Sequence, residues 1–199
     1  GNHDVPLFNL VARAFDPYRG FRRVFGHKLE PRFESPQWLV QGVDCTRRWR
    51  HKDGELSRRQ IDRVAAALRQ ASAAQLRVVV VHQPPAVQRA QDEGDLLRGA
   101  EVALRQWAAA GADIVLGGHI HLPYVLPMHE RWPELPRRLW VVQAGTAVSS
   151  RLRHEAGNSV NLLRRSVDQP ELVCVERWDF GDGRFNQVAV DRLQVQRDA

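Results

Sequence analysis

Two short apolar runs in the middle of the chain constrain its fold most. In Leu76–Val81 every residue except Arg77 is apolar, and most are β-branched valines. Asp113–Leu116 is a second, shorter run. Nearly continuous runs of this kind are typical of strands covered on both faces. Helical spacing of apolar residues predicts a helix over Ser57–Ala73, before the first run, and another over Asp95–Ala110, before the second. With a strand over Trp38–Cys45, this alternation predicts an α/β fold with parallel strands.

The ends of both predicted helices carry recognisable signals. Ser57 and Gln60 have the spacing of a capping box, in which each side chain bonds the other's backbone N–H. Gly111 follows the second helix and suits a C-cap.

The second half of the chain reads as strand rather than helix. Turns separate four strand-like segments, and Asp182 and Gly183 form a hairpin signal between the last two. The four segments are Leu139–Ala144, Ser159–Arg165, Glu171–Asp179 and Arg184–Leu193. We therefore expect two packed sheets with helices outside, in one domain over residues 1–199.

Two other stretches are less regular. A short helix is predicted within Val5–Phe15, followed by a turn around Asp16–Gly20. Leu122–Arg138 contains four prolines and is expected to be an excursion, either capping a site or forming a surface loop.

Charge and cysteine usage exclude some function classes. The formal net charge is +6, but the arginines are scattered and form no block of like charges, so specific nucleic-acid binding is not favoured. No apolar run reaches the roughly 18 residues of a membrane span. Cys45 and Cys174 have no CxxC spacing, and we interpret them as buried thiols in a reducing, cytoplasmic compartment rather than as a disulfide.

Histidines follow two of the predicted strands. His82 comes directly after the first run, and Gly117–His121 (GGHIH) follows the second. Ligands of open α/β sheets bind at the carboxyl edge, so these imidazoles should meet there. In extended backbone, His119 and His121 would point to the same side and present two nitrogens to one pocket, as metal binding requires.

The tetrapeptide Gly1–Asp4 (GNHD) adds further polar groups. Asn2 offers a neutral carbonyl oxygen, and shells of oxygen and imidazole suit Mn, Fe, Zn or Mg. His3 is better placed as a charged general acid, because the neighbouring Asp4 would raise its pKa and orient it. Each motif alone has an ordinary structural interpretation, and only the combination favours a metal site. The other histidines are expected to be exposed and without such a role: His27, His51, His129 and His154.

GNHD, then His82–Pro85 (HQPP) after a strand, then GGHIH, resembles the calcineurin-like metallophosphoesterases. The nearest group is the small bacterial phosphodiesterases similar to class III cyclic-nucleotide phosphodiesterases. The resemblance extends to about Asn161 and includes Asp53–Leu56 and Gly145–Ala147. It implies a four-layer α/β/β/α sandwich and a small phosphoester substrate, a diester rather than a monoester.

The resemblance also implies two divalent metal ions, whose bridging hydroxide attacks phosphorus. Asn2, His82 and His119 would bind one metal, and His121 the other. His3 would protonate the leaving alkoxide, with Asp4 supporting it.

The family also has an Asp-x-His element and a Gly-Asp element before GNHD, which supply the bridging carboxylate and most ligands of the first metal. Neither stands before GNHD in this sequence. We therefore expect the first strand–helix units, about 60 to 90 residues, to be missing. Such a chain alone should hold at most one metal weakly, hydrolyse diesters slowly or not at all, and self-associate.

Two alternatives remain open, a nuclease or nucleic-acid-binding module and a non-catalytic scaffold. Arg151 and Arg153 are weaker candidates for substrate contacts.

Overall fold

Six strands form a mixed sheet with a parallel centre. In the computed structural model, which describes residues 1–153 and 156–197, the strand order is β1-β2-β3-β4-β6-β5. The central strands β2, β3, β4 and β6 are parallel, and the two outer strands β1 and β5 run antiparallel to their neighbours. The bounds are β1 Arg32–Glu34, β2 Trp38–Gly42, β3 Leu76–Val80, β4 Ile114–Gly117, β5 Tyr124–Pro127 and β6 Trp140–Gln143. The predicted parallel strands are therefore confirmed.

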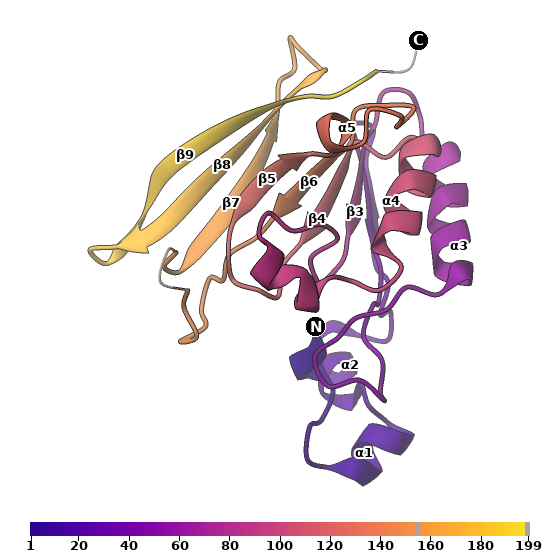
Figure 1. Ribbon diagram of the computed structural model, residues 1–199, viewed down its shortest axis with the longest axis vertical. Helices are drawn as coiled ribbons and strands as arrows, with labels where there is room; N and C mark the ends of the chain where they lie inside the picture. The colour runs from indigo at the N-terminus through magenta and orange to yellow at the C-terminus, as the bar shows by residue number, and fades with distance from the viewer. Residues whose placement is uncertain (154–155, 198–199) are drawn as a thin grey trace.

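Two helices cover one face of this sheet (Figure 1). They are α3, Arg58–Arg69, and α4, Ala100–Ala109, and both predicted helices are thus present in shorter form. The Ser57 capping box opens α3, as predicted. Trp107 is fully buried between the helices, and its indole N–H donates to the Ile61 carbonyl at 3.1 Å.

A second, antiparallel sheet packs on the other face. It consists of β7 Ser159–Arg165, β8 Leu172–Gly181 and β9 Arg184–Gln194. Val173, Val175 and Leu193 from this sheet share a buried cluster with Val78 and Ile114 from the first. The two packed sheets that we expected are confirmed.

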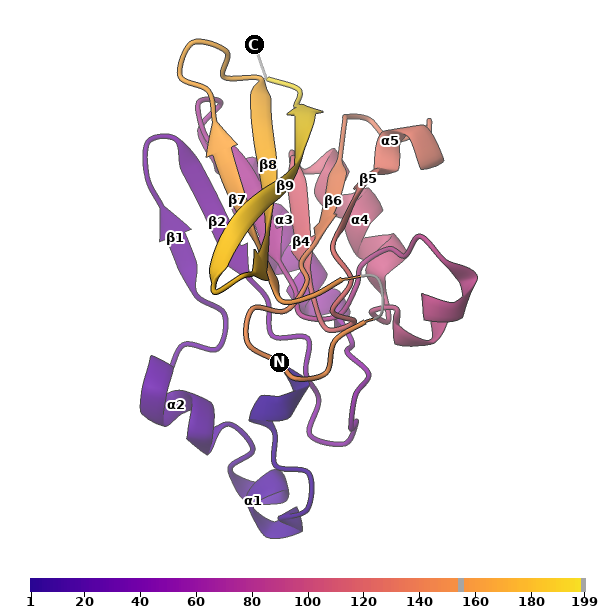
Figure 2. The same ribbon diagram turned by 90° about the vertical axis from the view of Figure 1, so that its left-hand side faces the viewer.

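The layers number three within the described residues, rather than the expected four (Figures 1 and 2). Helices lie outside the first sheet, whereas no described helix covers the outer face of β7–β9. That face keeps apolar side chains in contact with solvent, among them Phe180, Val188 and Val190.

Part of the segment Leu122–Arg138 belongs to the sheet, so the expectation that all of it is an excursion is wrong. It contains β5, which pairs with β6, and the short helix α5, Met128–Arg131. The prolines suggested an irregular segment, but a strand at the edge of a sheet tolerates a residue that lacks an N–H group. Pro127 ends β5 at that edge.

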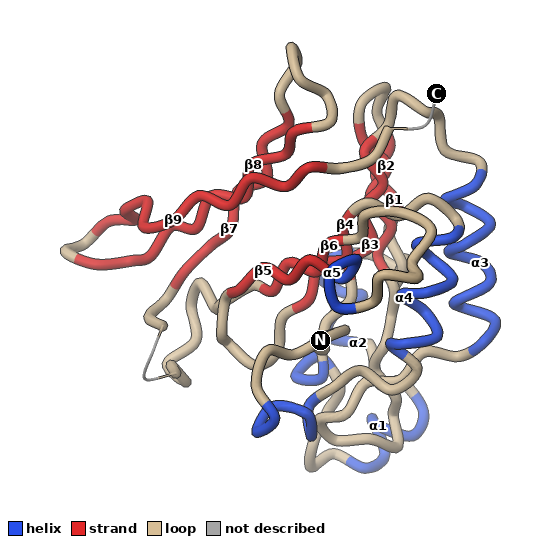
Figure 3. Tube along the Cα trace, turned by 45° about the horizontal axis from the view of Figure 1, so that its top comes forward, coloured by secondary structure: helices blue, strands red, loops and turns tan. Residues whose placement is uncertain are grey.

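The remaining boundaries differ for local reasons. Helix α4 begins at Ala100, because Gly99 adopts a left-handed φ of 82° that separates it from the 3-10 helix η2, Ala90–Asp95. At the N-terminus, the 3-10 helix η1 (Asn2–Asp4) precedes α1, Leu10–Phe15, and α2, Arg19–Phe25, at one end of the molecule (Figure 3). Helix α2 overlaps the predicted turn and β1 was not predicted, since both are short and lack a clear apolar period.

Both cysteines are free; Cys45 is buried and Cys174 is half-buried. No described helix has the length and apolar character needed to cross a bilayer.

Candidate metal centre

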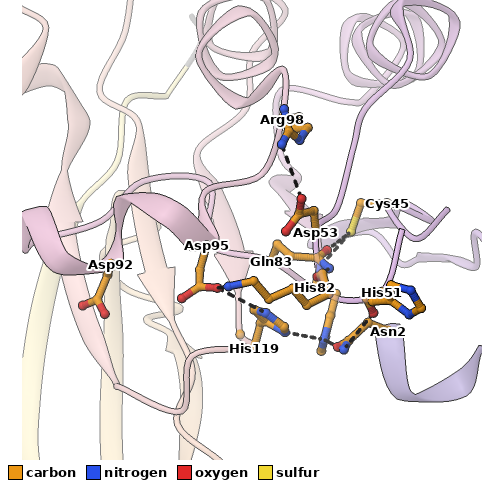
Figure 4. Close-up of polar contacts among 12 residues, drawn as sticks. Asn2, Cys45, His51, Asp53, His82, Gln83, Asp92, Asp95, Arg98 and His119 are labelled. Carbon is orange, nitrogen blue, oxygen red and sulfur yellow. Dashed lines mark hydrogen bonds and ion pairs between the residues drawn. The ribbon is translucent and has the colours of Figure 1, made fainter. Parts of the chain in front are cut away.

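The parallel strands bring His82 and His119 together at the carboxyl edge of the first sheet. Strand β3 lies beside β4, with Val80 opposite Leu116, and each histidine follows its strand. His82 Nε2 lies 3.3 Å from His119 Nδ1 and 3.0 Å from the Asn2 side-chain oxygen (Figure 4). We call these three side chains the Asn2–His82–His119 cluster.

Close packing at residues 1 and 2 sets the position of the amide. A Cβ atom on Gly1 would lie 2.3 Å from the His82 ring, so a larger residue there could not approach it so closely. The Asn2 side-chain nitrogen contacts the His51 carbonyl at 3.5 Å. A carbonyl only accepts, so this contact turns the amide oxygen toward His82.

Hydrogen bonds alone cannot satisfy all three atoms of the cluster. If His82 Nε2 carries hydrogen, it donates to the Asn2 oxygen, and His119 Nδ1 is left without a well-directed hydrogen bond. If His119 Nδ1 donates to His82 instead, the Asn2 oxygen loses its donor. A cation can accept a lone pair from all three atoms at once. Metal–ligand bonds of about 2.1 Å place neighbouring ligand atoms about 3.0–3.4 Å apart, which fits the two observed distances.

The electrostatic surroundings keep both imidazoles neutral. Burial is the main cause that lowers the pKa of His82 to about 3, and the neighbouring His119 adds to it, because two adjacent imidazoles cannot easily both be protonated. Burial also lowers the pKa of His119, and the carboxylate of Asp95 partly opposes this effect. Neutral imidazole is the form that binds a metal ion.

His119 and His121 are not in extended backbone, so that part of the sequence reasoning is wrong. Their φ angles are 74° and 56°, in the left-handed region. The Ile120 N–H bonds the Gly118 carbonyl at 2.9 Å and closes a tight turn with His119 at its centre. Each such residue costs about 1–3 kcal/mol, and strain of this kind concentrates at functional sites.

His121 has a hydrogen-bond partner outside the Asn2–His82–His119 cluster. His121 Nδ1 lies 2.6 Å from the Arg151 carbonyl, which only accepts, so Nδ1 carries the hydrogen. Its Nε2 therefore keeps a lone pair for a ligand.

Nearly all the predicted site residues line one cleft of about 360 Å³. The cleft is lined by Asn2, His3, Lys52, His82, His119, Ile120, His121, Arg151, Leu152 and Arg153. Arg153 is not free to move within it, because its guanidinium pairs with the buried carboxylate of Asp92. The Arg151 side chain is exposed.

Asp4 does not line this cleft. Its carboxylate contacts Gly1, and it lines a neighbouring cavity of about 90 Å³ that borders the other side of His82. The expected pairing of Asp4 with His3 is not among the contacts of the described residues.

Sequence reasoning missed the residues that support the cluster. Gln83 is fully buried, accepts from the Cys45 thiol at 3.0 Å, and donates to the Lys52 carbonyl at 2.8 Å. The His82 N–H donates to the same sulfur at 3.2 Å. Gln83 directly follows His82, which was the available signal; Cys45 and Lys52 are distant in sequence and carried none.

The other histidines differ in their exposure to solvent. His27 and His51 are exposed, as expected. His129 is half-buried, its ring edge against Trp140 with centroids 5.0 Å apart, so its expected exposure is wrong. His154 lies outside the described residues.

No set of three or more His, Cys, Asp or Glu side chains within residues 1–153 and 156–197 is arranged to hold a metal ion. The cluster differs from such a set because it combines two imidazoles with an amide. No family model and no curated protein matches the chain. The contacts among these side chains are therefore what indicates a metal site.

Proposed function

We propose that the chain carries part of the active site of a metal-dependent phosphoester hydrolase of the calcineurin-like metallophosphoesterase type. A diester is favoured over a monoester by the motif resemblance alone. The observation that carries the proposal is the position of His82 Nε2, which lies 3.0 Å from the Asn2 side-chain oxygen and 3.3 Å from His119 Nδ1 at the carboxyl edge of a parallel sheet.

The architecture is compatible with this proposal. Two sheets packed face to face, with α3 and α4 outside the first, correspond to three layers of an α/β/β/α sandwich. We propose that the chain has this fold without one outer helical layer.

The residues that would hold a metal follow from the donor atoms. Asn2, His82 and His119 would bind one divalent ion, and Nε2 of His121 is available to a second. Mn, Fe, Zn and Mg suit such oxygen and nitrogen ligands. A bound divalent ion would polarise the phosphoryl group and make water a stronger nucleophile.

Other side chains have roles that follow from their place in the cleft. His3 lines it and is exposed, so it can deliver a proton to a leaving oxygen without the support of Asp4. Arg151 lies at the same cleft and would attract the phosphoryl oxygens. Arg153 shapes the wall through its pairing with Asp92.

The first test measures metal binding. Titration calorimetry of the chain with Mn²⁺ or Zn²⁺ should show one weak, saturable site. His82→Ala and His119→Ala each remove a ligand and should weaken binding more than about tenfold. The matched control is His27→Ala, because His27 is exposed and lies outside the cleft. Equal affinity in all four proteins would contradict the proposal.

The second test measures turnover of bis(p-nitrophenyl) phosphate. Any hydrolysis should be slow, should require the added metal, and should be lost in His119→Ala. Metal binding accompanied by the same background hydrolysis in the wild type and His119→Ala would favour a non-catalytic scaffold.

A further inference from the structure

We infer that Asp95 is a positioning residue that turns the Nδ1 lone pair of His119 toward the cluster, and that Lys52 holds Asp95 in place. The inference rests on the proposed function, since it assigns a supporting residue to the proposed metal site. Asp95 ends η2, far in sequence from the three cluster residues.

The three side chains form a row at the cleft. One Asp95 carboxylate oxygen lies 3.9 Å from His119 Nε2 and 3.0 Å from Lys52 Nζ. His119 points toward Asp95 with one ring nitrogen and toward His82 with the other (Figure 4). The exposed fractions of the His119 and Asp95 side chains are 12% and 27%, so solvent screens this contact only in part.

A carboxylate at this position selects one tautomer of His119. Hydrogen on Nε2 faces the carboxylate, which leaves Nδ1 as a lone pair facing His82 and Asn2. In the other tautomer, Nδ1 donates to His82 Nε2 across 3.3 Å and places a proton where a metal would bind. Asp95 favours the first tautomer, because a negative charge attracts the N–H and repels the lone pair.

Lys52 fixes the acceptor. Asp95 is the last residue of the short 3-10 helix η2, and its carboxylate could rotate away from His119 without a second partner. The Lys52 ammonium contacts the same oxygen that faces the ring. The backbone carbonyl of Lys52 is in turn tied to buried Gln83, so the residue is anchored even though its side chain is largely exposed.

The competing interpretation is an ordinary surface ion pair between Lys52 and Asp95. Such pairs contribute about 0–1 kcal/mol and would leave the His119 ring indifferent to Asp95. The ring tautomer and the metal affinity distinguish the two cases.

The experiment reads the His119 tautomer by long-range ¹H–¹⁵N NMR of the full, metal-free chain labelled at histidine. The wild type should show hydrogen on Nε2. Asp95→Ala should shift the population toward hydrogen on Nδ1, and Asp95→Asn, which keeps an acceptor oxygen, should lie between them. Asp62→Ala is the control, since it removes an exposed pair with Arg58 on α3.

Zn²⁺ calorimetry is the second readout. Asp95→Ala should bind about 10–100-fold more weakly than the wild type, Lys52→Gln less severely, and Asp62→Ala equally well. An unchanged tautomer in Asp95→Ala would overturn the inference, as would a loss in Asp62→Ala equal to that in Asp95→Ala. The tautomer is measured without metal or substrate, so failure of the wild type to bind metal would refute the proposed function and leave the role of Asp95 decided by NMR.

Discussion

Single glycines decide how closely the site's supporting residues pack. A Cβ atom on Gly54 would lie 2.2 Å from the Gln83 side-chain oxygen and 2.9 Å from Leu97. Gln83 cannot easily retreat, because it is fully buried and bonded to both Cys45 and Lys52. The residue next to His82 is therefore held by a contact that only glycine allows.

Gly54→Ala should lower the free energy of unfolding by about 1–3 kcal/mol, the usual cost of overpacking a filled site. Metal affinity should fall as well, because Gln83 and the adjoining His82 must shift. Gly20→Ala is the control: nothing lies within 4 Å of its added Cβ, and alanine is favoured inside α2. Urea denaturation measures the free energy of unfolding of both variants. A Gly54→Ala protein as stable as Gly20→Ala would show that Gln83 has room to move.

At the scale of elements, the start of α3 anchors the loop that leads to the cleft. The Ser57 hydroxyl and the Gln60 N–H complete the capping box. The Gln60 side chain also donates to the Asp44 carbonyl at 2.6 Å and accepts from Arg47 at 2.6 Å. One helix terminus thus fixes the chain that follows β2.

Ser57→Ala should lower the free energy of unfolding by about 1 kcal/mol, because a helix N–H loses its acceptor. Ser57→Asp should retain the stability, since aspartate caps equally well and suits the positive end of the helix dipole. Thermal unfolding compares the three proteins. Metal affinity should not change, and equal stability of the alanine and serine forms would show that Gln60 alone secures this terminus.

At the scale of the whole molecule, no described helix or strand covers the outer face of the second sheet. Phe180 and Phe185 pack edge to face with centroids 5.3 Å apart, yet both remain exposed, as do Leu162, Val188 and Val190. Strand β9 also forms an open sheet edge. Exposed apolar faces and free edges both favour association between copies.

Light scattering over a concentration series should show self-association of the chain. Val190→Lys should shift it toward monomer, because the charge must be desolvated when two such faces meet. Val167→Lys is the control: it adds the same charge at an exposed position in the turn between β7 and β8. A wild-type monomer at every concentration would rule out this face as an association surface.

Local patterns predicted the central elements because each carries its own signal. Continuous apolar runs identify β3 and β4, and a capping box with helical spacing identifies α3. Strand ends then placed His82 and His119 near each other without any knowledge of contacts. The pattern failed where pairing rather than composition creates the element, as in β5, which exists because β6 offers it an edge.

Periodicity and strand ends are local properties of the chain, so the parallel α/β centre and the side chains at its carboxyl edge could be predicted from the amino-acid sequence alone. The left-handed turn at His119, the placement of Asp4 and His3 in different cavities, and the row formed by Lys52 and Asp95 arise only in the folded chain. Those features depend on loops distant in sequence meeting in space, and no local pattern encodes which loops will meet.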